Sequence, residues 1–337
     1  MGGTEEDTLQ LRHSAQTERI ILCPDGDAFL VVAGSDKSVE REFLVSSTVL
    51  GLASDYFKAL FTSGFKEGRE TRSGICPRIP LKGDDPEAML VLLSILHFQN
   101  LADNDTVELR TLEAISIVCD KYDCIKALRP WIPLWLGNYK DAKLEDLGSF
   151  MSAAYHFRDS DALRRISSMA ICHFNTDIEL PWPKELFGAV EKQSKKLLSD
   201  LHTVLQTGES LTRCYAQGHK PDGPVCLLCR GLLPRRMSSK PQHLCARTEF
   251  HDSYYTIQSL VGEYFAALRE AQLWPSTQPF QSSTAACIVQ RFGSAARTCR
   301  DRCSTRTCPL RATLEHLSKM AEQMLRDARG ITLEELS

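Results

Sequence analysis

One stretch of the chain, residues 43–68, constrains the fold more than any other. Its large apolar residues recur every three or four positions, which places them on one face of a helix. These residues are Val45, Val49, Leu52, Tyr56, Phe57, Leu60 and Phe61. Residues 46–48 and 54–55 offer hydroxyl and carboxylate side chains, which accept the free amide hydrogens at helix starts. The stretch therefore predicts two short helices in a hairpin, closed by a cap or tight turn at Gly64.

Ahead of this stretch the sequence predicts a β-hairpin. Short segments rich in β-branched and apolar residues, at 20–22, 28–33 and 40–45, are typical of strands. A Pro-Asp-Gly turn separates the first two segments, and the Gly-Ser-Asp-Lys segment at 34–37 connects the second to the third. Strands that lead directly into a helical hairpin predict an α+β fold.

One strand and two longer helices are predicted after the helical hairpin. The apolar residues of 72–81 predict the strand, in which Pro80 favours an edge position. Pro86 suits the first position of a helix, and apolar residues repeat at helical spacing from there to residue 97. The same spacing recurs over 106–122. The N-terminal part is therefore predicted to be a small β-sheet capped by helical hairpins.

This order of elements, together with several fixed positions, resembles the BTB/POZ domain in the form common among fungal proteins. The matching positions are Asp27 before the second strand, then Leu50, Ser54, Tyr56, Phe57, Phe61 and Glu67. The stretch from Cys119 to Cys124 is also similar to one typical of such domains. The resemblance covers about residues 18–135 and implies a protein–protein interaction module that self-associates. The alternative is an unrelated α+β domain with the same periodicities.

One departure from the family concerns the start of the helical hairpin. Many members carry a histidine and a basic residue there, and this pair lines a pocket near the dimer axis. Ser46 and Ser47 occupy these two positions here. The family's pocket is therefore not carried over to this chain, and the expectation of a homodimer depends on the rest of the domain.

The triplet Phe65-Lys66-Glu67 carries the expectation of a specific partner. In BTB adaptors that recruit a cullin ubiquitin-ligase scaffold, an apolar-x-Glu motif follows the helical hairpin, and this triplet stands at the matching place. A phenyl ring can anchor in a partner's groove while Glu67 meets a basic or hydroxyl group. Burying such a ring stabilises by roughly 1.5–3 kcal/mol. The alternative is that Phe65 packs beneath its own loop.

The composition changes along the chain and predicts five parts. Residues 1–18 are polar and predict a disordered tail, followed by the BTB/POZ-like domain at 19–136. Helical periodicity predicts a helical extension over 137–206 and a C-terminal helical region over 251–337. Between these two, residues 207–250 are rich in Pro, Gly, Arg and Cys and predict a loop-rich segment.

The overall composition limits the partners and the compartment. The net charge of −3 in 337 residues gives no electrostatic footprint for nucleic acid. A run of about 18 apolar residues is absent, so the sequence predicts no membrane span. The N-terminus does not resemble a secretory signal, and thirteen cysteines without one favour free thiols in a reducing compartment. We therefore expect an intracellular protein, in the cytoplasm, the nucleus or both.

The second half of the chain contains one candidate metal site. Cys226 and Cys229 form a Cys-x2-Cys pair, and His243 and Cys245 follow. Two close pairs of thiolate and imidazole ligands suit tetrahedral zinc, so these four residues are the candidate ligands of a structural zinc ion. The alternative is free thiols on a turn and a loop, because chance clusters are expected among thirteen cysteines.

The sequence contains no pattern that predicts catalytic residues. It lacks a phosphate-binding glycine loop, a nucleophile elbow and a His-Glu-x-x-His pair, and the pair Asp84-Asp85 suits a helix start. We therefore expect a binding protein and not an enzyme, first of all a substrate adaptor for a cullin-type ubiquitin ligase. The alternatives are a non-ligase scaffold or transcription-linked regulator with a BTB dimerisation domain, and a zinc-stabilised binding module.

Overall fold

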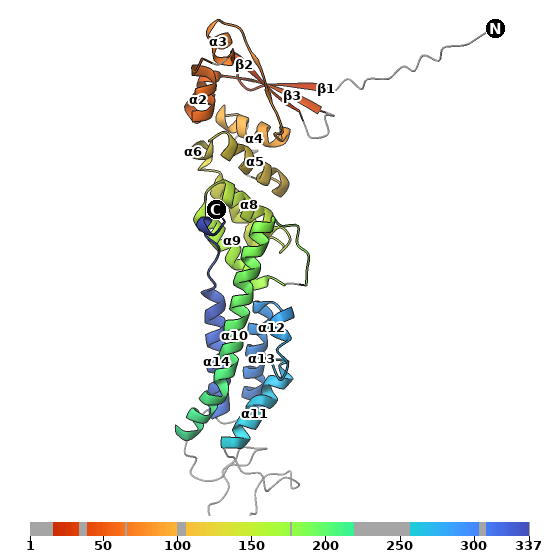
Figure 1. The fold of residues 1–337 in the computed structure, drawn as a ribbon, viewed down its shortest axis with the longest axis vertical. Helices are drawn as coiled ribbons and strands as arrows, with labels where there is room; N and C mark the ends of the chain where they lie inside the picture. Colours follow the sequence, from red (N-terminus) through yellow and green to blue (C-terminus); the bar gives the residue numbers. More distant parts are fainter. Residues whose placement is uncertain are drawn as a thin grey trace, which may run out of the picture. The chain divides into compact units, whose positions relative to one another are not determined.

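The computed structural model describes residues 16–33, 39–64, 66–99, 106–175, 177–218, 257–302 and 308–336. They fold into two compact units, one within residues 1–163 and the other within residues 164–337 (Figure 1). Helix α9 (Ser160–His173) begins in the first unit and continues into the second. The boundary that the sequence predicts between residues 136 and 137 stays a prediction.

A four-stranded sheet forms the base of the first unit. Its strands are β1 (Gln16–Ile21), β2 (Ala28–Ala33), β3 (Val39–Val45) and β4 (Arg78–Leu81), in the order β1-β3-β2-β4. β2 and β3 are antiparallel, whereas β1 and β4 each run parallel to their neighbour. β4 is an edge strand, which confirms the position predicted for Pro80.

One face of this sheet is buried over β2, β4 and the end of β3. Its buried residues are Ala28, Leu30, Val32, Phe43, Val45, Ile79 and Leu81. Helix α4 (Pro86–Leu96) contacts β2 and β3, and its Met89, Leu92 and Leu93 are also fully buried. Asp85 caps this helix by accepting a hydrogen bond of 2.9 Å from the Ala88 amide, and Pro86 occupies the first helical turn as predicted.

Short helices complete the first unit. They are α1 (Ser47–Ala53), α2 (Asp55–Thr62), α3 (Lys66–Arg72), α5 (Leu109–Lys121), α6 (Ile125–Leu128), α7 (Ile132–Gly137), the 3₁₀ helix η2 (Asn138–Asp141) and α8 (Leu147–His156). α5 packs against α4 on one side and α8 on the other. A small sheet with helical hairpins, followed by helices, confirms the predicted α+β class.

The regular elements of the second unit are all helices among its described residues. It contains α10 (Lys184–Gly218), α11 (Ile257–Glu270), α12 (Pro279–Ser282), α13 (Ala285–Arg302), α14 (Pro309–Arg326) and the 3₁₀ helix η4 (Leu333–Glu335). α10, α11, α13 and α14 lie side by side along much of their length (Figure 1). Their shared core includes Leu201, Phe292 and Leu317, all at most 1% exposed. None of the helices among the described residues is long and apolar enough to span a membrane.

The chain after α14 returns to α9. The Ile331 amide donates to Ser167 Oγ at 2.8 Å, and Ser168 Oγ donates to the Ala328 carbonyl at the same distance. A side chain at Gly330 would collide with the Arg164 carbonyl, so glycine allows this close approach. These contacts fix the last described residues against the beginning of the second unit.

Two predicted boundaries differ from the structure. β1 begins at Gln16, inside the predicted tail of residues 1–18, because Glu18 and Arg19 pair with Arg41 and Glu42 across the sheet. Residues 1–15 lie outside the described residues. Helix α10 continues to Gly218, although the sequence predicts a loop from residue 207.

Contacts on two faces explain the extra length of α10. Gly208 lies against Tyr264 of α11, and Thr212 donates a hydrogen bond to the Gly208 carbonyl while contacting Thr313 of α14. This part of the helix has a polar composition, so its sequence lacks the apolar periodicity that would have predicted these contacts. The rest of the predicted loop, residues 219–250, lies outside the described residues.

The Gly208 contact gives a test of the α10–α11 packing. A methyl group at residue 208 would collide with the Tyr264 hydroxyl and lie 2.7 Å from Leu317 Cδ1, whereas one at Gly188 of the same helix would meet open space. We expect Gly208→Ala to lower the free energy of unfolding by about 1–3 kcal/mol. Gly188→Ala should raise it by about 0.5–1 kcal/mol, since alanine is the better helix former. Chemical denaturation followed by circular dichroism measures both, and stabilisation by both substitutions would contradict the packing described.

Candidate partner-binding site

The two helices of the predicted hairpin begin at serine caps. Ser46 Oγ accepts the Val49 amide at 3.4 Å at the start of α1, and Ser54 Oγ accepts the Phe57 amide at 3.1 Å at the start of α2. Both serines have extended backbone geometry, as N-caps do. The capping positions predicted from the sequence are therefore those used in the structure.

Asp27 connects the sheet to this hairpin. Its Oδ1 accepts the Ser47 amide at 2.7 Å, and its Oδ2 accepts the Ser47 hydroxyl at 2.6 Å. Ser47 is the first residue of α1, where a negative charge also interacts favourably with the helix dipole. The aspartate of the family motif thus fixes the start of α1 against the beginning of β2.

His97, at the end of α4, also contacts the start of α1. Its Nδ1 lies 2.9 Å from the Leu93 carbonyl, and its Nε2 accepts the Ser46 amide at 3.1 Å. An unprotonated Nε2 is required to accept that amide, so Nδ1 carries the proton and donates it to Leu93. Burial lowers the pKa of His97, which favours this neutral form, while the bond to Leu93 acts in the opposite direction.

Ser54 also connects the hairpin to the end of α5. Its hydroxyl donates to the Tyr122 carbonyl, and the Tyr122 ring stacks on Phe57 with 5.0 Å between the ring centroids. The Tyr122 hydroxyl donates to Asp84, and Lys121 pairs with the same carboxylate at 2.6 Å. Burial raises the pKa of Tyr122, so its hydroxyl stays protonated and remains a donor.

The remaining residues of the family motif belong to this core or border it. Leu50 and Phe57 are fully buried and Phe61 is 6% exposed, whereas Tyr56 is 44% exposed. The Tyr56 ring contacts Tyr122 edge to face, with centroids 5.1 Å apart. The motif therefore combines a buried core with one aromatic side chain at the surface.

The junction between α2 and α3 is held by contacts from both helices. Gly68 of α3 approaches the Phe61 carbonyl so closely that any side chain there would collide with it. Arg72, one turn later, donates to the Thr62 carbonyl at 3.1 Å and to the Ser63 carbonyl at 3.4 Å. These are free carbonyls at the end of α2, where a cation is favoured. Gly68 and Arg72 therefore hold α3 against the end of α2.

The predicted partner-binding triplet lies at this junction. Lys66 and Glu67 occupy the first turn of α3; Lys66 is 76% exposed and pairs with Glu70 at 3.6 Å, and Glu67 is half-buried. Phe65 lies outside the described residues. The structure therefore places two of the three residues at the surface, immediately after the helical hairpin.

The candidate zinc ligands Cys226, Cys229, His243 and Cys245 all lie outside the described residues. Within the parts of the chain that the structure describes, no cluster of histidine, cysteine and carboxylate side chains could hold a metal ion. Seven described cysteines are free thiols: Cys23, Cys76, Cys119, Cys124, Cys172, Cys214 and Cys287. Burial raises the pKa of Cys124 to about 12, so this thiol stays neutral and packs as a small apolar side chain.

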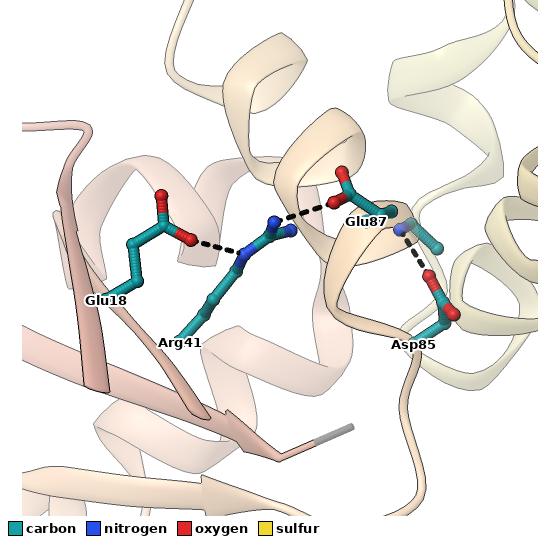
Figure 2. Close-up of polar contacts among 5 residues, drawn as sticks. Glu18, Arg41, Asp85 and Glu87 are labelled. Carbon is teal, nitrogen blue, oxygen red and sulfur yellow. Dashed lines mark hydrogen bonds and ion pairs between the residues drawn. The ribbon is translucent and has the colours of Figure 1, made fainter. Parts of the chain in front are cut away.

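Sequence reasoning missed one group of polar residues that orients α4 on the sheet. Arg41 donates to Glu18 at 2.8 Å and to Glu87 at 2.6 Å, so it joins β3 to β1 and to the first turn of α4 (Figure 2). The hydrogen bond to Glu87 is the main cause that raises the pKa of Arg41. The sequence did contain a signal for this group. Arg41 is two residues before Phe43 and four before Val45, so the alternation of a strand places it on the same face as these buried residues.

Comparison with known proteins agrees with this architecture. Residues 25–128 match the family model described as BTB/POZ domain. This match covers the sheet from β2 onward and the helices from α1 to α6. It confirms the resemblance found in the sequence and, with it, the general role of a protein–protein interaction module. No curated protein matches the chain.

Removal of the Ser54 hydroxyl should destabilise the first unit. Ser54→Ala deletes the cap of α2 and the hydrogen bond to the Tyr122 carbonyl, and loss of such a cap costs about 1–2 kcal/mol. The exposed Ser73, which follows α3 and whose hydroxyl donates to the Arg69 carbonyl of that helix, is the control, and Ser73→Ala should change stability by less than about 0.5 kcal/mol. Equal effects of the two substitutions in denaturant titrations would contradict the role assigned to Ser54.

His97 should make the stability of the first unit depend on pH. Its pKa is lowered in the folded state, so the unfolded chain takes up the proton first, near its ordinary pKa of about 6.5. The stabilisation is therefore complete above that pH and is lost as the pH falls toward the lowered pKa. We expect the free energy of unfolding to fall less steeply between pH 7 and 5 in His97→Asn than in the original chain.

The exposed His173 provides the control for this pH experiment. His173→Asn is the matched substitution, because it makes the same replacement at an exposed histidine of the second unit. A pH profile that His97→Asn does not flatten would show that the neutral ring of His97 contributes nothing to stability.

Proposed function

Because residues 25–128 form a BTB/POZ domain, we propose that this chain is a substrate adaptor for a cullin-type ubiquitin ligase. The α2–α3 junction contacts the cullin, and the helical second unit selects the substrate. The observation that carries the proposal is the position of Lys66 and Glu67, directly after the helical hairpin and in the first turn of α3, which Arg72 holds against the end of α2.

The contacts of α3 with the end of α2 favour binding, because this helix loses little conformational freedom when a partner docks on it. Glu67 lies in the first turn of α3, so its carboxylate needs no loop to reorganise before it meets a cationic or hydroxyl group. Arg72 and Gly68 hold this helix through their contacts with Thr62 and Phe61 at the end of α2. In the proposed complex, Phe65 supplies the apolar anchor and Glu67 the polar contact.

Self-association is the second part of the proposal. Leu52 at the end of α1 is 85% exposed, and Tyr56 at the start of α2 is 44% exposed. These two apolar side chains lie on consecutive helices and are available to a second copy of the chain. A dimeric adaptor would bind two cullins and two substrates, which raises the effective concentration of each partner.

The proposal also implies where the protein acts and what the alternatives would require. A cullin partner places the protein in the cytoplasm or the nucleus. A non-ligase scaffold or transcription-linked regulator would use the same domain for dimerisation without a cullin. Structural zinc at Cys226, Cys229, His243 and Cys245 would be compatible with either role.

Substitution of the junction residues tests the cullin proposal. The full chain is expressed with an affinity tag, and a cullin is sought among the co-purified proteins by mass spectrometry. Its affinity is then measured for the original chain and for Phe65→Ala and Glu67→Ala. We expect each substitution to weaken binding by roughly tenfold or more, as for an interface anchor.

Glu108→Ala is the matched control, because Glu108 is an exposed acid at the start of another helix, α5. It should leave cullin binding unchanged, and thermal melting should show that all variants remain folded. The absence of any co-purified cullin, or binding that Phe65→Ala and Glu67→Ala leave intact, would refute the adaptor role and favour the non-ligase scaffold.

A further inference from the structure

The face of the sheet opposite α4 carries a charged cluster that none of the roles above uses. The strand register places Arg19 of β1, Phe29 of β2, Glu42 of β3 and Arg78 of β4 on this face. The two arginines come from the two edge strands and both pair with Glu42 between them. We refer to these four residues as the Arg19–Arg78 cluster.

The cluster presents positive charge to solvent. The Glu42 side chain is only 2% exposed, whereas those of Arg19 and Arg78 are 57% and 53% exposed. One carboxylate shared between two guanidinium groups leaves one positive charge uncompensated. The acidic group is hidden beneath the basic ones, so a partner meets the guanidinium groups first.

An aromatic ring lies beneath both guanidinium groups. Arg19 Cζ is 5.1 Å and Arg78 Cζ 5.8 Å from the centroid of the Phe29 ring, within the range of cation–π contacts. Arg19 uses only its Nε and Nη2 for Glu42, at 3.3 and 3.2 Å. Each guanidinium carries five N–H donors, so donors remain for another acceptor. The Phe29 ring holds these donors in a defined plane.

Most of the residues around the cluster are apolar. Ile21 of β1 is 60% exposed on the same face, and Pro80 of β4 is exposed two residues after Arg78. Leu44 and Val31 between them are half-buried. Glu40 is the other acidic residue of this face among the described strand residues, and it lies two positions before Glu42 on β3.

We propose that this face binds a peptide segment of a protein partner that carries a carboxylate beside a large apolar side chain. The carboxylate pairs with the free donors of Arg19 and Arg78, in the two-pronged geometry that arginine favours. The apolar side chain covers Ile21 and Pro80. Arginine and aromatic residues together are typical of the energetically important centres of protein interfaces.

This site is separate from the α2–α3 junction and does not depend on the cullin proposal. Its residues come from the four strands of the sheet, whereas the junction belongs to α2 and α3. Loss of cullin binding in the Phe65→Ala variant therefore leaves the proposed peptide site unaffected. Failure of the peptide experiment likewise leaves the cullin proposal unaffected.

Selection from a random library tests the proposal. Short random peptides displayed on phage are selected against the full chain, and the enriched peptides are synthesised and measured by fluorescence anisotropy. We expect them to share an aspartate or glutamate next to a large apolar residue. Replacement of that acid by its amide should weaken binding by roughly tenfold, as for loss of a charge-assisted hydrogen bond.

Two substitutions in the cluster should shift the affinity in opposite directions. Arg78→Gln removes one guanidinium group and leaves the Arg19–Glu42 pair in place. The affinity for the peptide should therefore fall by roughly tenfold. Glu42→Gln removes the carboxylate that competes for the two arginines, so the affinity for the peptide should rise. Arg110→Gln, at an exposed arginine of α5, is the control that should change nothing. Thermal melting confirms that each variant is folded.

Opposite shifts for Arg78→Gln and Glu42→Gln support the proposal, because general unfolding would weaken binding in both variants. The proposal is overturned if the library yields no binder, if the selected peptides lack acidic residues, or if Arg78→Gln leaves their affinity unchanged. A single-stranded RNA oligonucleotide that binds through Arg78 more tightly than the peptides would overturn it in favour of a nucleic-acid surface.

Discussion

The Ser54 hydroxyl is the contact on which the architecture of the first unit depends. It accepts the Phe57 amide in the first turn of α2 and donates to the Tyr122 carbonyl, so one oxygen atom joins the hairpin to the end of α5. Tyr122 then reaches Asp84 before α4 and stacks on Phe57. Three helices that are distant in the sequence are thus fixed relative to one another through one small polar side chain.

Local chemistry made much of the fold predictable. β2 runs from Ala28 to Ala33 as its β-branched residues predict, and α4 begins at Pro86 after a capping aspartate. α13 lies within the helical region predicted over 251–337, but its bounds were not predicted, because its buried face includes the small residues Ala285, Ala295 and Ala296, which give a weak apolar period. The last third of α10, residues 207–218, was missed because its packing against α11 and α14 uses glycine and threonine.

The candidate site was predictable to the extent that its residues act on near neighbours. Ser46 and Ser54 cap the helices that directly follow them, and the family pattern identified Asp27 and the aromatic residues. His97 could not be found in this way, because its partner Ser46 lies 51 positions earlier. The family's histidine at that place is replaced by serine, yet an imidazole from α4 contacts the same backbone amide.

The Arg72 side chain has a consequence for how the α2–α3 turn can change during evolution. Its guanidinium reaches back ten residues to Thr62, and Gly68 lies against the Phe61 carbonyl, so both contacts depend on the number of residues between them. Insertion or deletion of a single residue would rotate α3 and separate both pairs. Side chains in this turn are therefore open to substitution, while its length is fixed, and new specificity must arise by exchange of residues alone.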